Sequence, residues 1–185
     1  MRIIGGSFKG KSFKFKIPKQ IRPTSDFARE AIFDTLQNII SLDRINVLDL
    51  FAGTGMLGIE ALSRGASFCQ FVDKTKSAIN IISSNLSSLP IKNENYRITF
   101  ADVFAFLRTY ESEIKFELIF SDPPYGQALN SKLLGSNLIF KVARSGTIFV
   151  FESSPREILN ENERIKLLRA KDYGDTSIYF FKFVE

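Results

Sequence analysis

Residues 46–58, NVLDLFAGTGMLG, carry the strongest structural signal in the chain. An apolar run that includes one acid, Asp49, is followed by three glycines, and a helical pattern begins at Leu57. This order predicts a strand, a tight glycine turn and a helix. In such an arrangement, backbone N–H groups and a helix N-terminus can approach a bound ligand closely.

The glycine turn alone leaves two classes of enzyme open. Residues 53–58 satisfy the G-x-G-x-x-G pattern of dinucleotide-binding proteins, and Asp73 follows Gly53 by twenty residues. Two features favour another cofactor: Asp49 lies inside the strand end, where it suits a bound cation, and a later apolar run leads into DPPY at 122–125. The pair of motifs resembles the S-adenosylmethionine-dependent amino-methyltransferases, which methylate exocyclic nitrogens of nucleobases.

Apolar runs and helical patterns alternate along most of the chain. Strands are predicted at 47–50, 68–72, 97–100, 116–120 and 147–151, and helices at 57–64, 78–89, 103–107 and 132–140. Such alternation predicts right-handed βαβ units and a doubly wound parallel sheet. Two last strands, 166–173 and 177–183, are joined by Gly174-Asp175, a hairpin signal. We therefore predict an α/β, Rossmann-like methyltransferase fold: a mostly parallel, twisted, seven-stranded sheet with an antiparallel C-terminal strand.

Composition excludes several classes of function. The 185 residues suit one domain with a sizeable core, and no apolar run approaches the ~20 residues of a membrane span. Without histidine, Ser-His-Asp triads and the usual zinc ligand sets are excluded, and we expect no metal. A single cysteine, Cys69, excludes an internal disulfide. With no signal peptide evident, these features predict a cytoplasmic protein.

Positive charge is concentrated at the N-terminus. The net charge is +5, yet residues 1–25 hold seven basic groups and no acid, and the other 160 residues hold 18 basic and 20 acidic groups. Phe13, Phe15 and Ile17 alternate with polar residues, which predicts a strand paired with Ile3-Ile4. An edge strand guarded by lysines is the simpler alternative. We expect a basic β-hairpin extension at 1–25, a polyanionic partner for it, and a methyltransferase domain at 26–185.

A helix is predicted after this extension. Ser25 or Asp26 suits its N-cap, and its apolar stripe runs from Ala28 to Ile40. Arg29 and Glu30 are expected on its solvated face.

An ordered set of motifs resembles one bacterial family over nearly the whole chain. The motifs are RIIGG at 2–6, RPT at 22–24, REAIF at 29–33, LDLFAG at 48–53, GIEALSRGA at 58–66, DPPY at 122–125 and YGDT at 173–176. They resemble the RsmD-like S-adenosylmethionine-dependent 16S rRNA (guanine-N2)-methyltransferases. The resemblance implies a small N-terminal hairpin on the methyltransferase fold and action on RNA within small ribosomal subunit particles. Thr-Gly-Met at 54–56 departs from the expected Ser-Gly-Ala but keeps the hydroxyl.

The cofactor residues are expected where strands end. Asp49 and the glycine turn would hold the methionine part of S-adenosylmethionine, Asp73 the ribose hydroxyls, and Asp102 with the Val103 N–H the adenine. Each of Asp73 and Asp102 could instead be a turn residue or a helix N-cap. S-adenosylhomocysteine would be the product. The complete expected set is Thr24, Asp49, Phe51, Gly53, Thr54, Gly55, Asp73, Lys74, Asp102 and Val103.

The DPPY loop is expected to hold the target base. Asp122 and the Pro123 carbonyl would accept hydrogen bonds from the amino group, and Tyr125 would stack on the extruded base. A purely structural proline turn is the alternative. The residues expected to contact RNA are Arg2, Lys9, Lys11, Lys14, Lys16, Arg22 and Pro124.

Three rival functions follow from the same sequence. A DNA adenine-N6 methyltransferase shares both motifs but usually carries a separate target-recognition domain, for which no residues are left. An NAD-dependent oxidoreductase would leave DPPY without a role. A non-catalytic RNA-binding assembly factor would not need Asp122 and Tyr125. The partner expected is 16S rRNA, with no membrane association and a monomeric protein.

Overall fold

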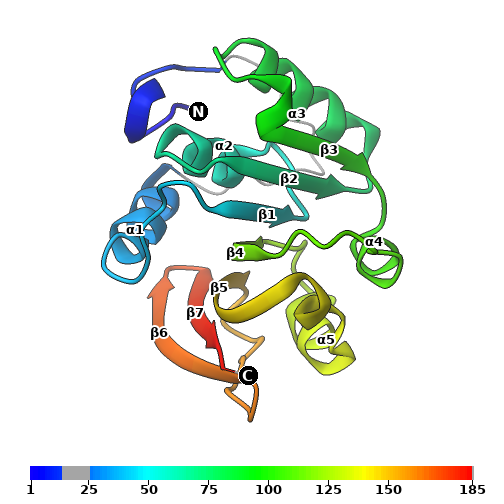
Figure 1. The fold of residues 1–185 in the computed structure, drawn as a ribbon. Helices are drawn as coiled ribbons and strands as arrows, with labels where there is room; N and C mark the ends of the chain where they lie inside the picture. Colours follow the sequence, from blue (N-terminus) through cyan, green and yellow to red (C-terminus); the bar gives the residue numbers. More distant parts are fainter. Residues whose placement is uncertain (14–25, 185) are drawn as a thin grey trace.

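A twisted seven-stranded sheet forms the centre of the molecule (Figure 1). The computed structural model describes residues 1–13 and 26–184. The strand order is β3-β2-β1-β4-β5-β7-β6, with β7 antiparallel to both of its neighbours and β1 to β5 parallel. This confirms the predicted fold. The strands are β1 (Asn46–Leu50), β2 (Phe68–Asp73), β3 (Tyr96–Phe100), β4 (Phe116–Ser121), β5 (Ala143–Ser153), β6 (Ile165–Tyr173) and β7 (Thr176–Phe183).

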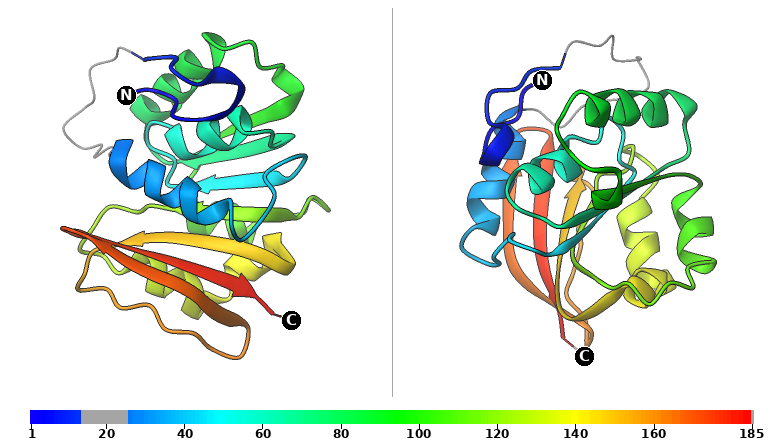
Figure 2. Two further views of the ribbon diagram at one scale, coloured as in Figure 1. Left: turned by 90° about the vertical axis from the view of Figure 1, so that its left-hand side faces the viewer. Right: turned by 45° about the horizontal axis from the view of Figure 1, so that its top comes forward.

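Helices cover both faces of the sheet (Figure 2). Those of the first face pack in one apolar cluster and those of the second face in another. The first face carries α1 (Asp26–Leu36), α2 (Met56–Ser63) and α3 (Lys76–Ser87), and the second carries α4 (Val103–Arg108), α5 (Leu129–Ser136) and the 3-10 helix η3 (Leu138–Val142). Two short 3-10 turns, η1 (Gly6–Phe8) and η2 (Asn93–Asn95), complete the elements. Within the described ranges, no helix has the length and apolarity needed to cross a membrane.

Neighbouring residues of one strand reach opposite layers of the core. Val47 packs in the cluster of α1, α2 and α3, whereas Leu48 packs with α4 and α5. Ile148 and Phe149 divide in the same way on β5. Successive side chains of a strand point to opposite faces, so a sheet covered twice needs continuous apolar runs. This is why the central strands read as uninterrupted apolar sequence rather than as alternation.

The glycines after β1 allow α2 to lie directly on β2. A Cβ atom at Gly58 would stand 2.3 Å from Cε1 of Phe71 and 2.6 Å from Sγ of Cys69. Both neighbours are fully buried, so neither can move aside. At the turn itself, Gly55 has a φ of +75°, a conformation that other residues rarely adopt. The motif therefore serves chain geometry as well as any ligand.

Arg29 corrects one prediction made from the sequence. It was expected on a solvated face but is fully buried, while Glu30 is exposed as expected. Arg29 precedes Ile32, Phe33 and Leu36 by three, four and seven residues, which places it on their face of α1. The helix pattern thus includes a buried charge that its apolar residues alone do not reveal.

The buried Arg29 belongs to the anchor of the N-terminal segment. It donates to the main-chain carbonyl of Arg2 at 2.5 Å and lies 3.8 Å from the carboxylate of Glu60. Glu60 is also fully buried, and its carboxylate accepts hydrogen bonds from the N–H groups of Ile4 and Gly5 at 2.8 and 2.7 Å. Residues 1–13 are thereby fixed against α2.

The described part of the extension is a hairpin. Ile3 and Lys11 are joined through a main-chain hydrogen bond of 2.9 Å, and Arg2 and Ser12 form a bridge. Gly6 passes so close to α2 that a Cβ there would be 1.8 Å from the carbonyl oxygen of Ser63. Phe15 and Ile17, which belong to the predicted strand, lie outside the described residues.

Three elements have boundaries that differ clearly from prediction. The helix predicted at 132–140 is divided into α5 and η3 by Asn137, whose φ of +58° ends α5. Asn tolerates this left-handed conformation better than most residues. Strand β5 is longer than the predicted 147–151, and the first helix ends at Leu36 rather than near Ile40. The other predicted elements after residue 46 end within two residues of the observed bounds.

Candidate active site

One cavity of about 330 Å³ opens at the carboxyl ends of the parallel strands. The segments that follow β1, β2, β3 and β4 contribute to it together with the last residues of β5, as expected for an open α/β sheet. The lining residues are Phe51, Gly53, Asp73, Lys74, Thr75, Val103, Asp122, Pro123, Pro124, Tyr125, Leu129 and Glu152. The glycine turn and the DPPY loop therefore face the same hollow.

Asp73 ties the loop after β1 to the loop after β2. One of its oxygens accepts from the Gly53 N–H at 2.9 Å, and the other accepts from the N–H and the hydroxyl of Thr75 at 2.8 and 2.9 Å. A carboxylate offers about four acceptor positions, so this arrangement leaves room for a further donor. Asp73 is both a turn residue and a wall of the cavity.

Asp49 lies beneath the glycine turn rather than in the lining of the cavity. It is 2% exposed, and its carboxyl group accepts from the Gly58 N–H at 3.0 Å. Burial raises the pKa of Asp49 to about 8; the Gly58 hydrogen bond acts against this rise, and the nearby charge of Asp73 adds to it. Below that pH, the group is a neutral carboxyl that can also donate a proton.

Asp102 is the N-cap of α4. Its Oδ1 atom accepts from the N–H groups of Phe104 and Ala105 at 3.0 and 3.2 Å. Its side chain is exposed and does not line the cavity, whereas the next residue, Val103, does. The helix-cap alternative is thus confirmed, and contact with an adenine remains a prediction.

Asn130 clamps the two strand ends that flank the DPPY loop. Its side chain is fully buried and accepts from the hydroxyl of Ser121, at the end of β4, at 2.7 Å. Its amide nitrogen donates to the Glu152 carbonyl at 2.8 Å and to the Ser153 hydroxyl at 2.9 Å, both at the end of β5. The loop between Ser121 and α5 is therefore held at both of its ends.

Tyr125 is held at the tip of its side chain. Its hydroxyl lies 2.6 Å from the hydroxyl of Thr176 and donates to the Glu152 carboxylate at 3.3 Å. Thr176 begins β7, so the ring is connected to a part of the chain far from it in sequence.

Of the sixteen predicted site residues that the structure describes, nine line the one cavity. The predicted residues that line the cavity are Phe51, Gly53, Asp73, Lys74, Val103, Asp122, Pro123, Pro124 and Tyr125. The predicted residues that do not line it are Asp49, Thr54, Gly55, Asp102, Arg2, Lys9 and Lys11. The last three are exposed on the N-terminal hairpin. Thr24, Lys14, Lys16 and Arg22 lie outside the described residues.

Three lining residues were not predicted: Thr75, Leu129 and Glu152. Glu152 could have been found, because it directly follows a predicted apolar strand, as Asp73 does. Thr75 and Leu129 carry no such signal, since each enters the cavity only through the path of its loop.

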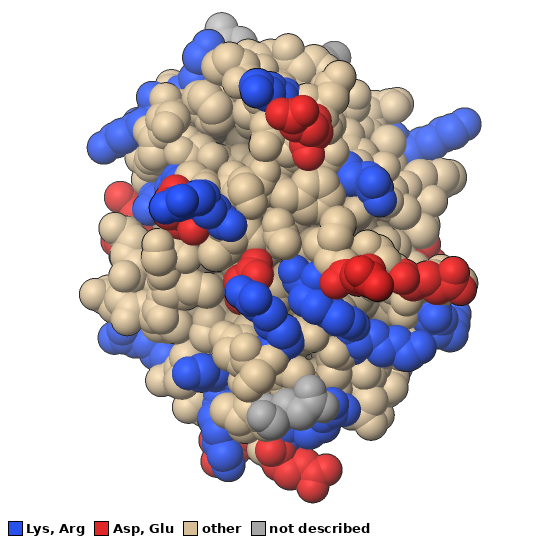
Figure 3. All heavy atoms as spheres, viewed as in Figure 1, with Lys and Arg blue, Asp and Glu red and all other residues tan. Residues whose placement is uncertain are grey.

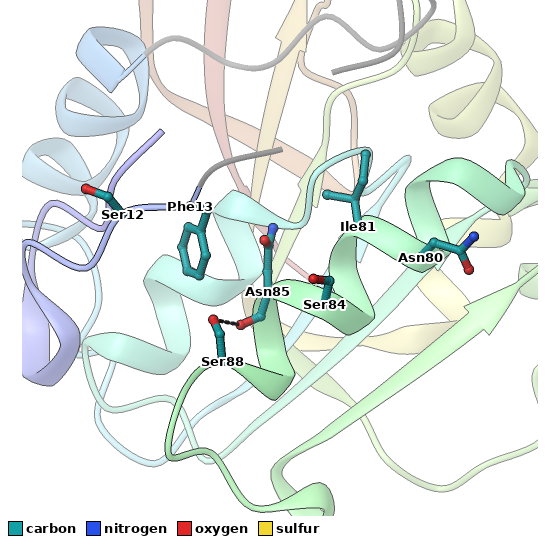
Figure 4. A pocket seen from close by; sticks show the side chains of 7 residues that line it. All are labelled: Ser12, Phe13, Asn80, Ile81, Ser84, Asn85 and Ser88. Carbon is teal, nitrogen blue, oxygen red and sulfur yellow. Dashed lines mark hydrogen bonds between the residues drawn. The ribbon is translucent and has the colours of Figure 1, made fainter. Parts of the chain in front are cut away.

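A second hollow of about 380 Å³ lies between the N-terminal hairpin and α3 (Figure 4). The ring of Phe13 points toward the helix, where Ser88 donates to the carbonyl of Asn85 at 2.7 Å. Its lining is uncharged among the described residues: Ser12, Phe13, Asn80, Ile81, Ser84, Asn85 and Ser88. It shares no lining residue with the cavity at the strand ends.

Comparison with known families shows to which protein family the chain belongs. The model of the family described as "Conserved hypothetical protein 95" matches residues 1–182. The chain belongs to this family. It is similar to ribosomal RNA small subunit methyltransferase D of Haemophilus influenzae, at 28% identity over 98% of this chain and 93% of that protein. The protein of the same name from a Buchnera aphidicola strain is 36% identical over 71% of this chain and 66% of its own length.

Solved structures give the same relationship. The yhhF protein of Escherichia coli has a TM-score of 0.83 at 26% identity, covering all of this chain and 98% of its own. The Thermus thermophilus protein TTHA0928 has a TM-score of 0.79 at 28% identity, covering all of this chain and 99% of its own. The family resemblance predicted from the motifs is therefore confirmed, and both solved proteins share the fold over the full length of this chain.

Proposed function

We propose that this protein transfers a methyl group from S-adenosylmethionine to the exocyclic N2 of a guanine in 16S rRNA of the small ribosomal subunit. The observation that carries the proposal is one cavity lined by both Gly53 and the DPPY loop at 122–125. Relatives named ribosomal RNA small subunit methyltransferase D support rRNA as the substrate.

The lining residues suit the proposed cofactor. The cavity volume, about 330 Å³, falls within the usual range of ligand sites. Asp73 offers carboxylate oxygens for ribose hydroxyls, and Phe51 and Val103 offer apolar contact for an adenine ring. The glycine turn leads into the N-terminus of α2, where N–H groups favour a carboxylate. When bound, S-adenosylmethionine supplies an electrophilic methyl group on a sulfonium.

The DPPY loop suits an exocyclic amino group. The lone pair of guanine N2 is delocalised into the ring, so the nitrogen is a weak nucleophile. Asp122 and the main-chain carbonyl of Pro123 would accept hydrogen bonds from its two N–H groups. These two contacts would draw the nitrogen toward tetrahedral geometry. The two prolines restrict the backbone and fix the direction of that carbonyl. No strong base is required, and the released proton passes to Asp122 or to water.

The remaining catalysis is positional. Tyr125 would stack on the extruded base, an interaction worth ~1–3 kcal/mol per base. Alignment of nitrogen, methyl and sulfonium can lower a barrier by roughly 7–11 kcal/mol. The clamp of Asn130 between Ser121 and Glu152 keeps the loop in one place for this purpose.

Methyl-transfer assays on defined substrates test the proposal. Purified protein is incubated with S-adenosylmethionine labelled in its methyl group and small-subunit particles from cells that lack the protein. We expect label in one guanine of 16S rRNA, identified as N2-methylguanine by nuclease digestion and mass spectrometry. Duplex DNA and naked 16S rRNA serve as comparison substrates. Label in adenine of DNA would replace the proposal with a DNA methyltransferase, and no label in any nucleic acid would favour an assembly factor.

A further inference from the structure

The turn between β6 and β7 reaches the candidate active site. Its sequence, YGDT at 173–176, is one of the motifs by which the chain resembles its family. The reaction proposed above gives this motif no role. Ser153, at the end of β5, pairs with Ser177 of β7, and Tyr173 pairs with Thr176 across the turn. Because β7 runs antiparallel to β5, its first residue lies beside the carboxyl end of β5. Thr176 therefore stands next to Glu152, a wall of the cavity.

Three side chains meet at this point. The hydroxyls of Tyr125 and Thr176 are 2.6 Å apart, whereas the Glu152 oxygen is 3.3 Å from the first and 3.5 Å from the second. A hydrogen bond between hydroxyls is normally about 2.5–3.0 Å long, so the contact between Tyr125 and Thr176 is the strong one. Thr176 and Glu152 are 6% and 7% exposed, so bulk water competes little for this contact.

We propose that Thr176 is a positioning residue for Tyr125, and that its hydroxyl holds the aromatic ring where the target base stacks. The inference rests on the function proposed above, in which the ring of Tyr125 contacts the base. A ring anchored only at Cβ can rotate about its side-chain bonds, and each rotation moves the stacking face. A second anchor at the hydroxyl restricts that rotation before the base arrives.

Glu152 orients the pair. Each of the two hydroxyls carries one proton, and the carboxylate at 3.3 and 3.5 Å attracts whichever proton is not shared between them. The main chain of Glu152 is itself fixed by Asn130, whose amide donates to its carbonyl at 2.8 Å. The position of the Tyr125 ring is thus fixed relative to β7 through Thr176 and relative to β5 through Glu152. Asn130 of α5 in turn holds the main chain of Glu152.

A double-mutant cycle on the full-length protein tests the proposal. Thr176→Val keeps the shape of the side chain and removes the hydroxyl, Thr176→Ser keeps the hydroxyl, and Tyr125→Phe keeps the ring. We expect Thr176→Val and Tyr125→Phe each to lower kcat/KM for small-subunit particles about three- to tenfold, the effect of losing one net hydrogen bond. Thr176→Ser should restore most of the wild-type value. The double variant should fall no further than either single variant.

The affinity for the cofactor product distinguishes a loss of Tyr125 positioning from damage to the fold. The dissociation constant for S-adenosylhomocysteine, measured by calorimetry, should stay within twofold of wild type in every variant. Ser177→Ala is the matched control, because it removes a 2.6 Å hydrogen bond to Asp172 in the same hairpin. It should leave kcat/KM unchanged.

Two results would overturn the proposal. One is wild-type kcat/KM in Thr176→Val, and the other is a double variant whose loss equals the product of the two single losses. If Thr176→Val lost its fold, the same conclusions would be drawn from Tyr125→Phe alone, which must lose activity at unchanged cofactor affinity. Methylation of another RNA nitrogen by the wild type would overturn the guanine target, and the cycle scored on that product would still test Thr176.

Discussion

At the scale of single residues, acids at strand ends divide into different roles. Asp73, Asp122 and Glu152 line the cavity, whereas Asp49 is buried beneath it and Asp102 caps a helix. All five follow the same pattern in the sequence, an acid at or just after an apolar strand. Their environments differ because each loop leaves the sheet in its own direction, so the surroundings of each acid decide its protonation and its partners.

Asp122→Ala is expected to abolish methyl transfer, with a loss of roughly a hundredfold or more in kcat, because one of the two proposed acceptors for the amino group disappears. Affinity for S-adenosylhomocysteine should fall less than threefold, since the residues assigned to the cofactor remain. Single-turnover kinetics and calorimetry measure the two quantities. Asp43→Ala, at an exposed side chain, is the control. Wild-type turnover in Asp122→Ala would remove Asp122 from the mechanism.

Asp49 predicts a defined dependence of stability on pH. Its pKa is about 8 in the folded protein and 3.8 for an ordinary Asp, so the folded state holds a proton that the unfolded chain loses. Its contribution to the free energy of unfolding is therefore fully present below about pH 4 and declines as the pH rises to about 8.

Asp49→Asn removes this titration and keeps an acceptor for the Gly58 N–H. Relative to the variant, wild type should lose stability between pH 5 and pH 8, by an amount on the order of a few kcal/mol. Urea unfolding at both pH values measures the difference. An equal gap between the two proteins at pH 5 and pH 8 would contradict the raised pKa.

At the scale of elements, two close approaches determine where α2 lies. Gly58 brings the first half of α2 onto β2, and Glu60 and Ser63 on the same helix hold the N-terminal hairpin. The motif GIEALSRGA at 58–66 therefore stabilises an arrangement of three segments. Several residues that carry the family resemblance, including Arg29 and Glu60, act in this anchor rather than in the cavity.

Gly58→Ala should destabilise the protein by about 1–3 kcal/mol, the usual cost of overpacking a core. The new Cβ would stand 2.3 Å from the ring of Phe71, which is fully buried. Gly135→Ala is the matched control, because Gly135 lies in α5 and a Cβ added there would meet nothing within 4 Å. It should stabilise the protein by roughly 0.5–1 kcal/mol. Thermal unfolding would contradict the packing argument if both variants shifted the midpoint in the same direction.

At the scale of the whole molecule, charge is distributed unevenly along the chain, whereas on one face of the molecule the two signs are mixed. Basic and acidic side chains are interspersed on the face shown in Figure 3. Seven basic residues in 1–25 still outweigh a net charge of −2 in the rest of the chain. Of these, Arg2, Lys9 and Lys11 are exposed on the hairpin and do not line the cavity. Contact with RNA phosphates at a distance from the target base is the role that suits them.

The double variant Lys9→Gln/Lys11→Gln should weaken RNA binding and flatten its salt dependence. Loss of two phosphate contacts lowers the slope of log K against log salt by about 1.4 to 1.8. Filter-binding measurements of K between about 50 and 200 mM salt give this slope. The control is Lys132→Gln/Lys141→Gln, which removes two exposed charges from the opposite face of the sheet. An unchanged slope in the first variant would show that Lys9 and Lys11 do not contact RNA phosphates.

The sequence by itself determined the sheet, its antiparallel last strand and the edge where the site forms. Periodicity is local, and parallel strands joined by right-handed crossovers must place their carboxyl ends together. For that reason Gly53, Asp73 and Asp122 could be assigned to one site from the order of strands and helices alone.

Only the tertiary structure decided which polar groups meet. The bond between Tyr125 and Thr176 spans 51 residues, and the bond between Ile4 and Glu60 spans 56. The burial of Arg29 depends on the same kind of contact. Such partners leave no trace in a local pattern, because each is chosen by the path of another segment. The physical reason is that hydrogen bonding and burial depend on distance in space, whereas periodicity records only distance along the chain.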